Sequence, residues 1–202
     1  PSQANSGREW QNAISNFLVG IASYFARRVG REIRGEVKYD QKYFIDTNNY
    51  DLVLALQPIL FQGLYSKSSH MISNCETSLR TLATFYPHLI LPGMMSSVEQ
   101  SLVDVNTSHR MMSNLQAMSG LANIAFNAEL NPGTCGQATS LINLLNLSLP
   151  GIDIIDPLKT SFTMAWLAIL FYVVPFIDAR DSTAGENEDD DVQLPDVNKL
   201  AA

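Results

Sequence analysis

Residues 160–177 form an uncharged, largely apolar run, and this run constrains the fold more than any other part of the sequence. Its length lies near the lower limit for a helix that crosses a bilayer. Two structures suit it: a membrane-spanning helix, or a helix enclosed on all sides within a large protein. Pro175 shortens the usable span and the flanking charges set no membrane orientation. We therefore favour the enclosed helix and expect Trp166 and Leu170 to lie in the core.

The first clear helix is predicted from about Trp10 to Ile33. Its apolar residues recur at steps of three and four: Trp10, Ile14, Phe17, Leu18, Ile21, Phe25, Val29 and Ile33. This spacing places them on one arc of a helix, which predicts one buried face. Gly35 is suited to ending the helix. We expect Trp10 and Phe17 to join Trp166 and Leu170 in the structural core.

Similar patterns continue along the chain, separated by proline, glycine and short polar stretches. The further expected helices cover residues 50–65, 72–86 and 137–147, a short stretch after Leu91-Pro92-Gly93, a segment starting near Ser108, and one opened by Pro157 behind an Asp156 cap. Pro58 is expected to kink or divide the helix that contains it. No segment shows the alternation of a β-strand.

Leu-Pro-Gly occurs twice, at residues 91–93 and 149–151, each time near an expected helix end. We interpret the two copies as a weak internal repeat. Successive helix pairs that each leave an apolar face to be covered are typical of solenoids. The sequence therefore predicts an all-α fold, an α-solenoid of HEAT-like antiparallel helix pairs.

Charge divides the chain into two expected parts. Residues 1–181 are predicted to be a HEAT-like helical segment of a larger solenoid. Residues 182–202 contain a dense acidic run and are predicted to be a disordered loop or linker. The formal net charge of −7 argues against direct nucleic-acid binding.

Basic residues gather near the end of the first helix. Arg27, Arg31 and Arg34 share one face, which Lys38 extends. Guanidinium groups pair well with phosphates, so one interpretation is a polyanion-binding site for an inositol polyphosphate. The alternative is an ordinary solvated helix face with cations favourably placed at a helix C-terminus.

Motifs for catalysis or metal binding are missing from the sequence. His70, His88 and His109 have no cysteine or acidic partner at ligand spacing, and no nucleophile motif occurs. Cys75 and Cys135 are interpreted as buried thiols. A group of five methionines is interpreted as core, with an adaptable peptide groove as the alternative: Met94, Met95, Met111, Met112 and Met118. We therefore predict no enzyme activity, no metal and no required cofactor.

One stretch resembles a known family. Leu149 to Thr160 reads Leu-Pro-Gly-Ile-Asp-Ile-Ile-Asp-Pro-Leu-Lys-Thr, and the apolar run after it ends in Val174-Pro175-Phe176-Ile177-Asp178. This pattern is similar to one in the giant single-chain proteasome activators, the two-hundred-kilodalton activator and fungal bleomycin-sensitivity family. The run Leu89 to Pro92 also looks similar.

The resemblance implies a segment of a HEAT-like dome that caps the proteasome core particle and opens it without ATP. It implies the entry of peptides and of unfolded or acetylated proteins, and a place in the nucleus and cytoplasm. Partners would be the core particle, through the parent chain, and protein or peptide substrates, with no nucleic acid and no membrane. The family's docking tail has an aromatic penultimate residue, which Lys199 to Ala202 does not match, so no functional residue is carried over. The alternatives are a HEAT-type scaffold for transport or chromatin and, less favoured, a single-pass membrane protein.

Overall fold

The computed structural model describes residues 2–36, 46–104, 108–126 and 138–174. Within these ranges the regular structure is helical and no strand occurs. The helices are α1 (Ser2–Ile33), α2 (Asp46–Gly63), α3 (Ser69–Phe85), α4 (Pro87–Val103), α5 (Ser108–Phe126), α7 (Ala138–Ser148) and α8 (Pro157–Val173), with the 3-10 turn η2 (Leu149–Gly151) before α8. The all-α prediction is confirmed.

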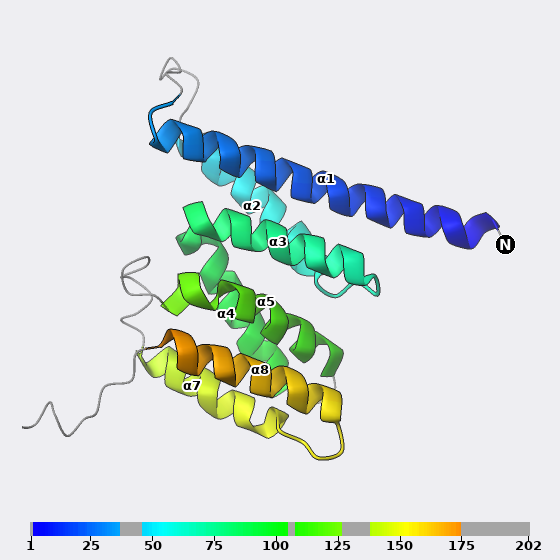
Figure 1. Ribbon diagram of the computed structural model, residues 1–202, viewed down its shortest axis with the longest axis vertical. Helices are drawn as coiled ribbons and strands as arrows, with labels where there is room; N and C mark the ends of the chain where they lie inside the picture. The colour runs from blue at the N-terminus through cyan, green and yellow to red at the C-terminus, as the bar shows by residue number, and fades with distance from the viewer. Residues whose placement is uncertain (1, 37–45, 105–107, 127–137, 175–202) are drawn as a thin grey trace, which may run out of the picture.

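The helices form two layers that run side by side along the molecule. In one layer, α1 packs on α3, α3 on α5, and α5 on α8. In the other layer, α2 packs on α4 and α4 on α7. Figure 1 shows α1 at one end of this stack, with α7 and α8 at the other. Consecutive helices thus alternate between layers, as expected for HEAT-like pairs in a solenoid.

A continuous apolar core lies between and along the two layers. Its largest fully buried side chains are Trp166, Leu60, Leu64, Leu79, Leu82, Ile90, Leu91, Met94, Leu115, Met118, Leu121 and Leu144. Met95 and Met111 are also buried. Four of the methionines are therefore core residues, which is the interpretation the sequence favoured over a peptide groove. Trp166 and Leu170 are confirmed as core residues.

The buried face of α1 is only partly the one predicted, since Leu18 and Val29 are buried and Ile14, Ile21 and Phe25 pack against the core. Trp10 is 68% exposed and Phe17 is 66% exposed, so their assignment to the core is wrong for this chain. Besides Leu18, the buried residues of α1 include small ones that the sequence pattern did not pick out, such as Ser15 and Ala22. Small side chains let the two helix backbones approach closely. In addition, α1 has 32 residues and α3 has 17, so at about 1.5 Å per residue α3 spans only half of α1.

Most predicted helix ends are confirmed, and the local chemistry explains them. Asp156 accepts a hydrogen bond from the backbone N–H of Lys159 (3.0 Å), and Pro157 opens α8 behind it. At the end of α1, Gly35 takes a φ of 69°. This left-handed conformation costs glycine little, so the helix stops there.

The predicted break at Leu91-Pro92-Gly93 is wrong, and of the kink or division expected at Pro58 the division does not occur, because both helices continue through proline. Pro92 lies inside α4, so Leu91-Pro92-Gly93 does not separate two helices. Pro58 likewise lies inside α2, which is not divided there. The second Leu-Pro-Gly is the 3-10 turn η2. The two copies thus occupy different structures, and the solenoid prediction was right although this repeat does not mark it.

Helix α8 is buried on one side only. Trp166 and Leu170 face the core, whereas Met164, Phe171 and Tyr172 are exposed. The prediction of a helix enclosed on all sides is therefore wrong for the described chain, where α5 is the helix that covers α8. No helix among the described residues is long and apolar enough to cross a membrane. The predicted linker at residues 182–202 lies outside the described residues.

Candidate functional site

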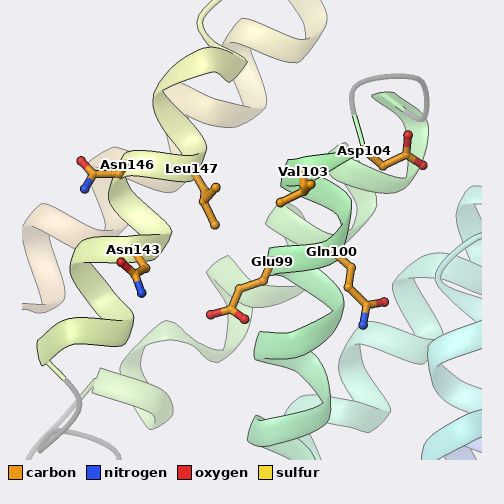
Figure 2. Close-up of a pocket in the computed structure, with 7 residues that line it drawn as sticks. All are labelled: Glu99, Gln100, Val103, Asp104, Asn143, Asn146 and Leu147. Atoms are coloured by element: carbon orange, nitrogen blue, oxygen red, sulfur yellow. The ribbon is translucent and has the colours of Figure 1, made fainter.

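A groove of about 610 Å³ lies between α4 and α7. Figure 2 shows Glu99 and Val103 on α4 and Asn143 and Leu147 on α7 directed toward the space between the two helices. Gln100, Asp104 and Asn146 complete the described lining. The groove thus combines aliphatic surface with amide and carboxylate groups.

Two features of the groove favour a positively charged occupant at Glu99. The groove lies at the C-terminal end of α4, where the helix dipole presents its negative pole. Glu99 and Asp104 add carboxylates, and the last turn of α4 contains no basic residue. The described lining residues include no lysine or arginine. Such a site favours a cation over an anion.

The sequence did not predict this groove. Its two walls are separated by about forty residues of chain, and neither wall has a recognisable motif. The sequence feature that could have indicated it is the pair of acidic residues Glu99 and Asp104 at the C-terminal end of a helix. Basic residues are usually preferred at that position.

Two of the predicted polyanion-binding residues, Arg31 and Arg34, are exposed but already pair with a carboxylate. Nε of Arg34 lies 2.7 Å from Glu36, and Nε of Arg31 lies 3.6 Å from the same side chain. These ion pairs raise the pKa of Arg34 and lower that of Glu36, mainly through the Arg34–Glu36 hydrogen bond. A polyanion at this face would compete with Glu36.

Among the described residues, Arg27, the third arginine of the predicted polyanion site, contacts an aromatic ring rather than a carboxylate. The guanidinium of Arg27 lies over the ring of Tyr24, 5.8 Å from its centroid. Lys38 lies outside the described residues. Nothing described here brings the four basic residues around one ligand, and the inositol polyphosphate site stays a prediction.

A serine–histidine contact between α1 and α3 has structural rather than catalytic geometry. The Ser15 hydroxyl is fully buried and lies within 3.0 Å of the carbonyl oxygen of Asn12, to which it donates. Nδ1 of His70 lies 3.2 Å from it, and the Asn74 amide donates to the same hydroxyl. A nucleophile needs access to substrate and an orienting acid behind the base. This network instead satisfies polar groups at a helix interface.

Neither a reactive cysteine nor a metal-binding cluster is found among the described residues. Burial raises the pKa of the Cys75 thiol to about 11, so the nucleophilic thiolate is scarce at neutral pH. No group of three or more histidine, cysteine or carboxylate side chains that could hold a metal ion occurs in the described part of the chain. Cys135 lies outside that part.

The motif that carried the family resemblance is a structural loop. Between η2 and α8, the Thr160 hydroxyl accepts from the backbone N–H of Asp153 (2.8 Å) and donates to its carbonyl oxygen (2.6 Å). The Asp153 carboxylate accepts from the backbone N–H of Ile155. Together with the Asp156 cap, these bonds satisfy the turn's backbone groups. The polar residues Asp153, Asp156 and Thr160 of the motif therefore stabilise the turn that connects η2 to α8.

The layered helix pairs define the class: an α-solenoid of HEAT-like repeats. A family profile described as the proteasome activator complex subunit 4, mid HEAT repeats region, matches residues 2–196. The chain belongs to this family.

Curated relatives agree with this assignment. The chain is similar to the human proteasome activator complex subunit 4, with 24% identity over 192 residues, 92% of this chain and 10% of the relative. It is also similar to the Xenopus laevis protein of that name, at 23% identity over 94% of this chain, and to proteasome activator subunit 4 of Arabidopsis thaliana, at 20% over 87%. The chain spans about a tenth of the length of these relatives. No solved structure matches it.

Proposed function

We propose that this chain is a structural segment of an ATP-independent proteasome activator, a scaffold that performs no catalysis itself. The observation that carries the proposal is the family match over residues 2–196, on a chain whose described helices stack as a HEAT-like solenoid. In this proposal the parent protein caps the core particle and promotes the entry of peptides and of unfolded or acetylated proteins. It acts in the nucleus and the cytoplasm.

The physical role of the segment is to hold its neighbours at a fixed spacing and angle. Each helix pair in a solenoid contacts only the adjacent pairs, so curvature is passed along the stack by packed side chains. The core from Leu60 to Trp166 is continuous through both layers, which supports a stiff rather than a hinged segment.

The experiment is co-sedimentation of the protein that contains this chain with purified core particles, followed by hydrolysis of a fluorogenic peptide without ATP. We expect co-sedimentation and faster hydrolysis. A protein that neither co-sediments nor accelerates hydrolysis contradicts the proposal and leaves a scaffold for transport or chromatin as the better account.

A matched pair of variants tests the structural role in the same assay. Leu170→Asp places a charge in the core beneath α8 and should abolish the acceleration, whereas Tyr172→Asp, on the exposed side of the same helix, should retain it. Equal activity of the two variants contradicts a structural role for this segment.

A further inference from the structure

The groove between α4 and α7 has a lining that selects for one kind of side chain. Val103 is the last residue of α4 and is 66% exposed. Leu147 lies opposite it on α7, and both point into the groove (Figure 2). An occupant that covers this pair removes apolar surface from water.

Below the aliphatic pair, the groove is lined by the Glu99 carboxylate and the Asn143 side-chain amide. Glu99 is directed across the groove toward Asn143 (Figure 2). Glu99 takes part in none of the ion pairs found among the described residues, and the negative end of the α4 dipole adds to its field. A cation placed here gains a carboxylate partner and an amide oxygen.

We propose that this groove binds a lysine side chain of a partner polypeptide. Lysine joins a four-carbon aliphatic stem to a compact charged head with three donors. The stem would contact Val103 and Leu147 while the ammonium reaches Glu99 and the Asn143 carbonyl oxygen. An uncharged side chain would satisfy only the aliphatic part, and an acidic one would be repelled by Glu99.

The volume supports this occupant. The groove, at about 610 Å³, is open and accommodates a side chain together with adjoining backbone. Two neighbouring cavities that share Asp104 with it measure only about 70 and 150 Å³. The inference goes beyond the proposed function, because it concerns a surface of this chain and requires no core particle.

The test is a titration of the isotope-labelled 202-residue chain, followed by the NMR shifts of the Val103 and Leu147 methyl groups and the Asn143 side-chain amide. The probes are four capped amino acids with a free side chain: lysine, Nε-acetyl-lysine, norleucine and glutamate. We expect saturable shifts with capped lysine, with a dissociation constant on the order of millimolar, and weaker binding of the other three. Higher salt should weaken the binding of lysine.

Glu99→Gln keeps the shape of the side chain and removes its charge, and should weaken lysine binding about five-fold, the loss expected for one partly exposed ion pair. Glu9→Gln removes the same charge from the exposed surface of α1 and should leave the binding unchanged. Three results overturn the proposal: no saturable shift with lysine, equal or tighter binding of norleucine or acetyl-lysine, or equal loss in the two variants. Retained methyl dispersion shows that each variant is folded.

Discussion

Leu170 and Tyr172 are two residues apart on α8 but have opposite surroundings. Leu170 is 1% exposed and joins the core, whereas Tyr172 is 90% exposed. Sequence hydropathy treats both as parts of the same apolar run. Their energetic roles differ because only one of them removes surface from water.

We expect Leu170→Ala to lower the free energy of unfolding by about 2–5 kcal/mol, because it removes buried methyl groups and leaves a cavity. Tyr172→Ala should change it by less than about 0.5 kcal/mol. Urea unfolding followed by circular dichroism measures both. Similar losses for the two variants would show that α8 is not packed on the face described here.

Glu76 carries a pH dependence that the sequence does not reveal. Burial raises the pKa of its carboxyl, while the hydrogen bond from Gln116 and the charge of Arg80 lower it by less. Because the pKa is higher in the folded state, the folded protein holds this proton more tightly than the unfolded chain does. The resulting stabilisation is complete below the ordinary carboxyl pKa and is lost as the pH rises through the raised value.

We therefore expect Glu76→Gln, which stays neutral, to gain stability relative to the unchanged chain as the pH rises from about 4 to about 7. The gain should stay below about 1 kcal/mol, because Glu76 is only half-buried and solvent screens its charge. Urea unfolding at several pH values measures it. Glu9→Gln, which removes an exposed carboxylate on α1, is the control. If the stability of Glu76→Gln relative to the unchanged chain falls as the pH rises, the raised pKa of Glu76 is contradicted.

At the scale of elements, glycine sets how closely helices approach. A Cβ on Gly93 of α4 would meet the Gln57 amide nitrogen at 2.6 Å and the Phe61 ring at 2.9 Å, both on α2. Gly120, on the exposed side of α5, has nothing within 4 Å of that position. The same residue type thus has a packing role in one helix and none in the other.

We expect Gly120→Ala to stabilise the chain by about 0.5–1 kcal/mol, as alanine does in an open helix position. Gly93→Ala should instead destabilise it, by about 1–3 kcal/mol, since the side chains of Gln57 and Phe61 on α2 must shift to make room. Thermal unfolding of both variants gives the comparison. Stabilisation by Gly93→Ala would mean that the α2–α4 contact is looser than described.

The turn before α8 should depend on the hydroxyl of Thr160. Thr160→Val removes both of its hydrogen bonds to the Asp153 backbone and should cost about 1–2 kcal/mol. Thr84→Val, which removes only a bond to the carbonyl of Arg80 within α3, should be nearly neutral. Urea unfolding compares them, and Thr160→Ser should recover most of the loss. A neutral Thr160→Val would remove the structural explanation of the motif.

At the scale of the whole molecule, the stack has a well-covered middle and less covered ends. Helix α3 contacts α1, α2, α4 and α5, whereas α1 has α3 as its main partner and α8 has α5. The exposed residues Trp10 and Phe17 lie at one end and Tyr172 at the other. Solenoid stability is a sum of contacts between neighbours, so stability should fall from the middle outward.

We expect amide hydrogen exchange in the isolated chain to be slowest in α3, α4 and α5, and faster in the first half of α1 and the last turn of α8. Exchange measured by mass spectrometry on peptic fragments resolves these segments. Uniform protection along the chain would show that the ends are covered, for example by self-association, which a concentration series would detect.

The sequence by itself determined the fold class, most helix positions and the Asp156 cap, because helical periodicity and capping act over a few residues. It also placed Trp166 and Leu170 in the core. It could not decide how far the buried face of α1 extends, since Trp10 and Phe17 fit the periodicity as well as Leu18 does. It also missed that α4 continues through Pro92. Those outcomes, and the groove between α4 and α7, depend on which helix packs against which, and that arrangement arises from contacts far apart in the chain.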